Sequence, residues 1–231
     1  MLPWQRDVLW VAWDLETTGA DPLQHEILEL AAVAWRYGLP RKDADYCFST
    51  RVRPRGHITS GATKIHGIRE ADVAQASLFE TAFENFMQFL ESVVEKHREE
   101  RGRAQRVDVV LVGHNNKTFD DPMLLACVLR LDACSSPNDY FVSRLPGVNL
   151  WASDTYVAAK EARKNGSLDL KKMTLVSLVF HFTGRQLCGA HAALNDAIGV
   201  LDIIPFVFSN LERYSYVGHA ADALRQRIDK K

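Results

Sequence analysis

Two carboxylates stand two positions apart at the end of an apolar run near the start of the chain. The run covers residues 8–13, and Asp14 and Glu16 follow it closely. In a β-strand, residues i and i+2 point to the same side, so both carboxylates can converge on one point. Because a buried strand gains no stability from ending in two like charges, we expect a cation between them, and hard oxygen ligands favour Mg²⁺ or Mn²⁺. The pair alone also fits a solvated strand end, so further residues have to decide.

Two more aspartates occupy positions suited to the same chemistry. Asp120 lies between an apolar run and the helix that follows it, and Asp196 lies about one turn into the last long helix. His191 precedes Asp196 in a glycine-containing loop. Strand ends and helix N-termini are where open α/β sheets gather their active sites. Asp121 competes with Asp120, but we assign Asp121 to the helix cap because Pro122 suits the first helical position.

The elements that must position these side chains alternate along the chain. Hydrophobic patterning predicts strands at residues 8–13, 26–35, 45–52, 107–112 and 149–153. It predicts helices at residues 78–101, 121–133, 175–182, 192–210 and 219–231. Three closely connected strands, followed by helices alternating with strands, indicate an α/β fold with a mixed sheet covered on both faces. No linker rich in Ser, Gly or Pro divides the chain, so we expect residues 1–231 to form one domain.

Composition narrows the class of protein. The chain is 47% apolar and 25% charged, as in a soluble globular protein with a full core. Its four cysteines form no Cys-x-x-Cys pair, which favours reduced thiols and a cytoplasmic or nuclear location. No run approaches the roughly 18 apolar residues that span a bilayer, so we expect no membrane partner.

Charge is balanced overall and concentrated locally. The net charge is −1, so a polyanion would have to be bound by metals and a few basic side chains. Two basic runs are candidates for phosphate contacts, and a solvated surface is the alternative for each. Their members are Arg51, Arg53 and Arg55 with His57, and Lys160, Arg163, Lys164, Lys171 and Lys172.

Several segments together resemble the motifs of the DnaQ-like, or DEDDh, family of 3′→5′ exonucleases. The matching segments are residues 14–19, 26–33, 58–68, 114–120 and 191–196. Each is weak alone, but their order and spacing make the set specific. The resemblance covers residues 8–204, and the chain is nearest in style to Trex-type exonucleases.

The resemblance implies a ribonuclease H-like fold, with a five-stranded mixed sheet and helices on both faces. It implies two Mg²⁺ or Mn²⁺ ions held by Asp14, Glu16, Asp120 and Asp196, an arrangement that stabilises the attacking and leaving oxygens of an in-line displacement. His191 would be the general base, because histidine titrates close to neutral pH. The implied product is a nucleoside 5′-monophosphate released from a 3′ end.

The resemblance also implies substrate contacts on one side of the site. The expected residues are Thr17, Ala20, Ile65, His66, Asn115 and Phe119. The backbone near Thr17 would hold the 3′-OH, and Phe119 would pack beneath the terminal nucleotide. Ala20 stands where the family carries a larger apolar wedge, so Leu23 or Ile65 is an alternative wedge.

The implied partner is nucleic acid, with single-stranded DNA favoured, and a homodimer is possible. The alternatives are an exoribonuclease that trims RNA 3′ ends, a polymerase-associated proofreading subunit, and a non-catalytic nucleic-acid-binding module. A degenerate module usually loses a carboxylate or the histidine. The intact set in this chain therefore favours an enzyme, with DNA repair as the expected setting.

Overall fold

The computed structural model describes residues 8–35, 46–100, 106–131, 141 and 143–229. Its strands form one mixed sheet in the order β3-β2-β1-β4-β5-β6. They are β1 (Val8–Thr17), β2 (Ile27–Trp35), β3 (Cys47–Arg51), β4 (Val107–Gly113), β5 (Val148–Asp154) and β6 (Tyr214–Ser215). β1, β2 and β3 are antiparallel neighbours, β4 and β5 continue the sheet in parallel with β1, and β6 is antiparallel to β5.

The predicted α/β class is confirmed, and the expected count of five strands is wrong by one. The sixth strand, β6, is two residues long, too short to show any periodicity in the sequence. The strand predicted at residues 149–153 pairs with β4 on one side and with β6 on the other.

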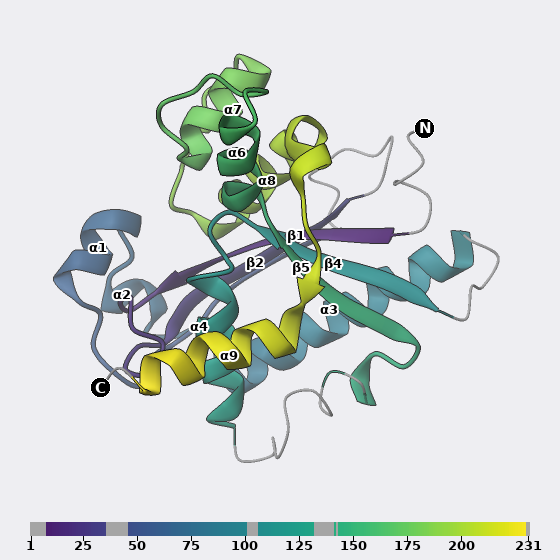
Figure 1. The fold of residues 1–231 in the computed structure, drawn as a ribbon. Coiled ribbons are helices and arrows are strands. Elements are labelled where there is room, and N and C mark those ends of the chain that lie inside the picture. The colour runs from purple at the N-terminus through teal and green to yellow at the C-terminus, as the bar shows by residue number, and fades with distance from the viewer. Residues whose placement is uncertain (1–7, 36–45, 101–105, 132–140, 142, 230–231) are drawn as a thin grey trace.

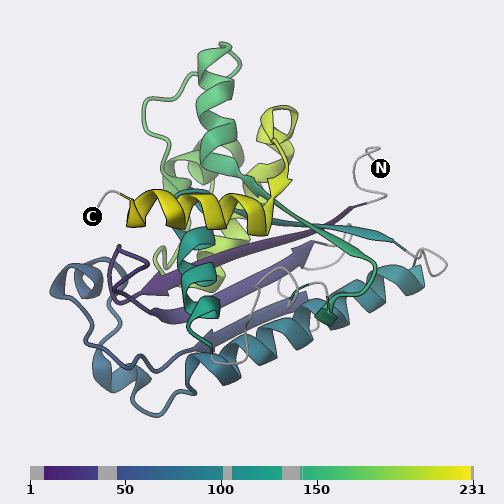
Figure 2. The same cartoon turned by 60° about the horizontal axis from the view of Figure 1, so that its bottom comes forward.

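Helices cover both faces of the sheet (Figures 1 and 2). They are α1 (Ser60–His66), α2 (Glu70–Val73), α3 (Phe79–Glu100), α4 (Asp120–Leu129), α6 (Thr155–Lys164), α7 (Leu175–Thr183), α8 (Ala193–Val207) and α9 (Tyr216–Ile228). The core shared with α3, α4 and α9 lies on one face, and the core shared with α6, α7 and α8 lies on the other. The sequence did not predict α6, which follows β5 without a loop because Asp154 caps it by accepting from two backbone N–H groups.

The central strand β1 sorts its side chains between these two cores. One set packs toward α3 and α4 and consists of Leu9, Val11, Trp13 and Leu15. Trp10 and Ala12 pack on the opposite face, toward α6, α7 and α8. Asp14 and Glu16 continue this second set, since side chains alternate along a strand. Both carboxylates therefore face the side of the sheet that α8 covers.

β1 extends four residues beyond its predicted end and past the strand beside it. Its pairing with β4 ends at Ala12 and Val112, whereas its pairing with β2 continues to Thr17. One edge of β1 is thus left open from residue 13 onward. Backbone groups on that edge are free to meet side chains from elsewhere in the chain, and the site forms there.

The expected cap of α4 is not the observed one. The helix begins at Asp120, its N-cap position is Phe119, and Asp121 is a fully buried residue of the first turn. Pro122 occupies the third helical position, where its missing N–H costs nothing because the first four N–H groups of a helix have no internal partner. The observed cap therefore lies two residues before the predicted one.

The helix α8 has a composition that needs an explanation. Residues Ala193–Asn210 are long and apolar enough to cross a membrane by length and composition, and half of that segment is buried inside the fold. α8 packs against β1, β2 and α7. Burial in the protein core is therefore enough to account for its apolar character.

Candidate active site

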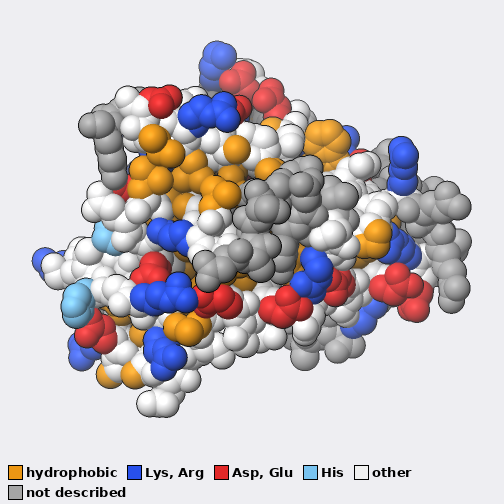
Figure 3. All heavy atoms as spheres, turned by 90° about the horizontal axis from the view of Figure 1, so that it is seen from below, with side chains coloured by type: hydrophobic (Ala, Val, Ile, Leu, Met, Phe, Trp, Pro, Cys, Tyr) orange, Lys and Arg blue, Asp and Glu red, His pale blue; other side chains and the backbone are white. Residues whose placement is uncertain are grey.

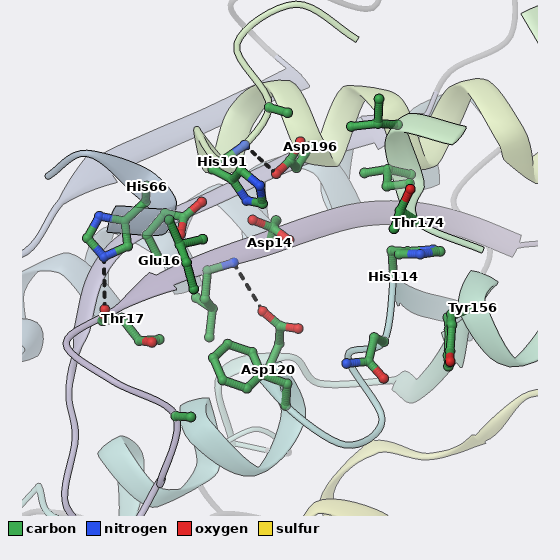
Figure 4. A pocket seen from close by; sticks show the side chains of 18 of the residues that line it. Asp14, Glu16, Thr17, His66, His114, Asp120, Tyr156, Thr174, His191 and Asp196 are labelled. Atoms are coloured by element: carbon green, nitrogen blue, oxygen red, sulfur yellow. Dashed lines mark hydrogen bonds between the residues drawn. The ribbon is translucent and has the colours of Figure 1, made fainter. Parts of the chain in front are cut away.

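An open pocket of about 1140 Å³ lies where β1 extends beyond β4. Its lining includes the five residues predicted to carry chemistry: Asp14, Glu16, Asp120, His191 and Asp196. It also includes every residue predicted to contact substrate: Thr17, Ala20, Ile65, His66, Asn115 and Phe119. Figure 4 shows the acidic side chains and His191 pointing into the same space from β1, α4 and the start of α8. The fold thus brings together groups that are far apart in the sequence.

Asp14 and Glu16 on β1 are costly to ionise where they lie. Burial, and then the carboxylates of Asp120, Asp196 and Glu16, raise the pKa of Asp14 well above its usual range. Burial and the neighbouring Asp196 carboxylate raise the pKa of Glu16 to about 8. Such shifts mean that the protein alone does not neutralise these groups when they are ionised. A cation in the pocket would do so.

Asp120 reaches β1 across the open strand edge. Its Oδ1 accepts a hydrogen bond from the backbone N–H of Leu15 at 3.2 Å (Figure 4). That N–H lies where β4 no longer pairs with β1, so the carboxylate replaces a strand partner. Burial, and then the charge of Asp121, raise the pKa of Asp120 well above its usual range. Asp120 is therefore fixed within one residue of Asp14 and Glu16 along the strand.

The loop before α8 carries the start of the motif at residues 191–196. His191 adopts a left-handed backbone conformation with φ of 65°, and its N–H donates to Asp196 Oδ2 at 2.9 Å. The other oxygen, Oδ1, is buried and has no hydrogen-bond partner among the described residues. Ligand atoms of Glu16, His191 and Asp196 all lie within 4.8 Å of one another. Two carboxylates, one of which has a buried oxygen without a partner among the described residues, fit a divalent cation, with the imidazole beside them.

Glu29 also belongs to this region, although it is not among the site residues expected from the sequence. It lies opposite Glu16 in the β1–β2 register and is 6% exposed. Its Oε2 accepts from the backbone N–H of Ala193 at 3.3 Å, and its Oε1 lies 3.6 Å from Arg51 Nε. Glu29 thus ties the start of α8 to the sheet beside the carboxylates. A single charge inside an otherwise apolar buried strand was the signal that could have identified it.

Two histidines in the pocket wall have structural contacts. The ring of His114 contacts Thr155 Oγ1 at 3.0 Å and the Met173 carbonyl at 2.8 Å. His66 Nε2 donates to the Thr17 carbonyl at 3.1 Å, and its Nδ1 accepts from the Ile68 N–H. Burial lowers the pKa of His66, which agrees with an Nδ1 atom that accepts a hydrogen bond. His66 therefore fastens the end of α1 to the strand end while it lines the pocket.

Gly19, in the motif at residues 14–19, packs directly against the ring of His25. A Cβ on Gly19 would lie 2.5 Å from the ring of His25, closer than any side chain tolerates. Ala20 follows and is exposed at the pocket. Leu23 was a candidate wedge, but it packs against α4 and α9 and does not line the pocket. Ile65 lines the pocket and is 61% exposed, so of these two candidate wedges only Ile65 reaches the pocket.

The two basic runs differ in position. The pocket is lined by Lys160, Arg163, Lys171 and Lys172 of the second run. In the first run, Arg51 approaches Glu29 and Arg55 pairs with Glu80, so carboxylates already neutralise part of it. On the face drawn in Figure 3, acidic and basic side chains are interspersed, as the net charge suggests. Positive charge in the pocket lining thus comes from α6 and the segment before α7, and Arg51 of the first run lies beside Glu29.

The fold and the pocket define a ribonuclease H-like domain with a carboxylate-lined site, and comparisons with known proteins identify the family. A family model described as Exonuclease (RNase T) matches residues 11–101, which include the motif at residues 14–19. These matches support assignment of the chain to the DnaQ-like, or DEDDh, family of 3′→5′ exonucleases.

Two curated relatives are similar to the chain over different lengths. A DNA polymerase III PolC-type protein of Caldanaerobacter subterraneus subsp. tengcongensis is 35% identical over 202 residues, which is 87% of this chain. A DNA polymerase III subunit epsilon-like protein of Rhodobacter capsulatus is 39% identical over 85 residues, which is 36% of this chain. The chain spans 12% of the length of each of these relatives.

Solved structures share the fold at low sequence identity. Cell-death related nuclease 4 (CRN-4) superposes with a TM-score of 0.60 at 16% identity, covering 88% of this chain and 64% of that one. An E. coli exonuclease I in complex with single-stranded DNA superposes with a TM-score of 0.58 at 18% identity, covering 88% of this chain and 42% of that one.

Proposed function

We propose that this domain is a metal-dependent 3′→5′ exonuclease that releases nucleoside 5′-monophosphates from a single-stranded or frayed 3′ end, with DNA as the favoured substrate. One observation carries the proposal. Donor atoms of Glu16, His191 and Asp196 converge within 4.8 Å, beside Asp14 and Asp120 in the same pocket. Family membership supports the reaction type, and the burial of the carboxylates supports a metal-bound state.

The residues present define which groups would bind the cations. Asp14, Glu16, Asp120 and Asp196 would hold two Mg²⁺ or Mn²⁺ ions, which supply Lewis acidity and neutralise charge on the phosphate when bound. Asp196 is suited to this role because Oδ2 accepts from the His191 N–H, while Oδ1 has no hydrogen-bond partner in the described part of the chain. Asp120 is suited to it because the Leu15 N–H orients its carboxylate.

His191 is the proposed general base. Its side chain is exposed at the pocket, on a loop directly before α8, where a ring nitrogen can take a proton from the attacking water. The backbone N–H of His191 is bound to Asp196, so the position of the imidazole is coupled to that of a carboxylate. A positioned base of this kind contributes about 10²- to 10⁴-fold to a rate.

The two sides of the pocket suit different parts of a nucleic-acid strand. Ile65 and Phe119 offer apolar surfaces to the terminal base, and stacking of this type tolerates any base. Lys160, Lys171 and Lys172 line the pocket on the side of α6 and α7, where they would contact phosphates upstream of the 3′ end. The fold-related exonuclease I has been solved with single-stranded DNA, which supports a single strand as substrate.

Digestion of matched end-labelled DNA and RNA strands with Mg²⁺ or Mn²⁺ tests the proposal. We expect a ladder of products shortened one nucleotide at a time from the 3′ end, mononucleotide release, and faster digestion of DNA. An Asp14→Asn protein prepared in parallel shows whether a contaminating nuclease contributes. Internal cleavage, or 5′-end release, would contradict the proposal, and faster digestion of RNA would favour the RNA-trimming alternative.

A proofreading role is a second candidate because both curated relatives are DNA polymerase III proteins. In that setting the domain would remove mispaired 3′ nucleotides for a polymerase. Primer–template duplexes that differ in one terminal base pair distinguish the roles. A proofreading domain degrades the mismatched primer faster in proportion to end fraying, and a polymerase that binds the domain increases that difference. Equal rates on both duplexes would contradict this role.

A further inference from the structure

The loop between β4 and α4 is held in place by the segment 214–227 near the C-terminal end of the chain. The loop carries Phe119 to the pocket and leads directly into Asp120. Figures 1 and 2 both show α9 lying across α4 beside this loop, and Leu125 and Ala126 of α4 pack there in one cluster with Ala220 and Leu224 of α9. The packing brings polar side chains of α9 against the loop backbone.

Two side chains of α9 bind consecutive carbonyls of the loop. His219 Nε2 donates to the Lys117 carbonyl at 3.1 Å, and Arg227 donates to the Thr118 carbonyl at 2.8 Å. These carbonyls immediately precede Phe119. The two donors lie about two helical turns apart along α9, so two separate points of the helix hold the loop backbone.

A buried cluster extends the same contact into the first turn of α4. The Tyr214 hydroxyl of β6 donates to Asp121 Oδ2 at 2.7 Å, and Asn116 Nδ2 donates to Asp121 Oδ1 at 3.1 Å. The ammonium of Lys117 lies 4.9 Å from the centre of the Tyr214 ring. Asp121 is fully buried and adjacent to Asp120, so its partners help to set the direction in which the helix begins.

The opposite side of the loop is held by the sheet. Asp154, at the end of β5, accepts from the Asn115 N–H at 2.9 Å and from the Lys117 N–H at 3.1 Å. Backbone donors of the loop are thus satisfied by β5, and backbone acceptors by α9. Asp120 itself meets β1 through a hydrogen bond of 3.2 Å, which is long for such a bond and depends on where the loop places the carboxylate.

We propose that β6 and α9 are positioning elements of the active site, and that His219 and Arg227 fix the loop that places Asp120 for metal binding and Phe119 for the terminal nucleotide. This inference rests on the proposed function, because it supposes that the position of the loop determines how tightly the site binds the metal ions. His219 and Arg227 do not line the pocket. Both act through the loop backbone.

Direct Mn²⁺ binding, measured by electron paramagnetic resonance of the free ion, tests this role without relying on turnover. The variants are Arg227→Ala, His219→Ala and their combination. Each removes one hydrogen bond to the loop, which is worth a factor of about 2 to 12 in an equilibrium. We expect the single variants to bind Mn²⁺ a few-fold more weakly and the double variant about tenfold more weakly. Arg227→Lys keeps a donor and is expected to recover most of the affinity.

Arg225→Ala is the matched control. Arg225 belongs to the same helix turn, carries the same charge and pairs only with the exposed Asp222 at 3.7 Å, among the contacts described. Its Mn²⁺ affinity is expected to stay within twofold of the parent protein. Thermal unfolding of every variant identifies the temperature at which all are folded, and affinities are compared there. If the double variant does not fold, Arg227→Ala alone decides the question.

The outcomes separate this inference from the proposed function. Parent-like Mn²⁺ affinity in folded Arg227→Ala and in the double variant would overturn the positioning role while leaving the exonuclease intact. An equal loss in Arg225→Ala would overturn it as well, because the effect would then be one of charge. Failure of the parent protein both to bind Mn²⁺ and to shorten DNA would instead reject the proposed function.

Discussion

Glu16→Gln should stabilise the metal-free protein, because the glutamate is costly to ionise where it lies. Glu16 is 7% exposed, and burial and Asp196 raise its pKa from 4.5 to about 8. Between these values the unfolded chain has released the proton and the folded protein retains it. The unfolded state then binds fewer protons, so the free energy of unfolding falls as pH rises from about 4.5 to about 8.

The size of the effect follows from the two pKa values. At pH 7 the pH is about 2.5 units above the pKa of 4.5 that the glutamate has in the unfolded chain. Each pH unit corresponds to about 1.4 kcal/mol, so ionisation of Glu16 in the unfolded state favours unfolding by about 3 kcal/mol. Glutamine does not titrate and removes this contribution. In a domain of this size 1 kcal/mol moves the thermal midpoint by about 2–4 °C, so the midpoint should rise by about 6–12 °C.

Thermal unfolding monitored by circular dichroism in EDTA, at several values from pH 5 to pH 8, measures this prediction. The midpoint of the parent protein should fall across the range and that of Glu16→Gln should fall less. Mg²⁺ or Mn²⁺ should raise the thermal midpoint of the parent protein at pH 8 and change that of the variant little. Glu99→Gln, an exposed change on α3, is the control and should follow the parent. A parent midpoint that is flat with pH, or a variant less stable at pH 7, would refute the reasoning.

Three further predictions concern activity. Asp14→Asn should abolish nucleotide release while circular dichroism shows an intact fold; appreciable turnover by a folded variant would exclude the metal role of Asp14. His191→Ala should lower kcat by about 10²- to 10⁴-fold in single-turnover assays, and an unchanged rate would remove it from the mechanism. Replacing Lys171 and Lys172 by alanine should raise KM for long strands and reduce the salt dependence of binding by about two phosphate contacts, measured by fluorescence anisotropy. Lys164→Ala, in the same basic run but outside the pocket lining, should leave both unchanged.

The sequence by itself determined the class of fold and the residues that gather in the pocket. Buried strands and amphipathic helices have local periods, so their existence could be predicted without knowing their partners. Asp14 and Glu16 could be placed on one side of a strand for the same reason. The motif at residues 191–196 likewise indicates that His191 lies just before a helix and that Asp196 lies in its first turn.

Only the tertiary structure decided which groups support that pocket. Leu15 and Asp120 are 105 positions apart, and Ala193 and Glu29 are 164 apart, so no local pattern links them. Periodicity reports which side of an element is buried, and it carries no information about which element buries it. The roles of Glu29 and of α9 depend on packing between distant segments, and that packing is resolved only when the whole chain is folded.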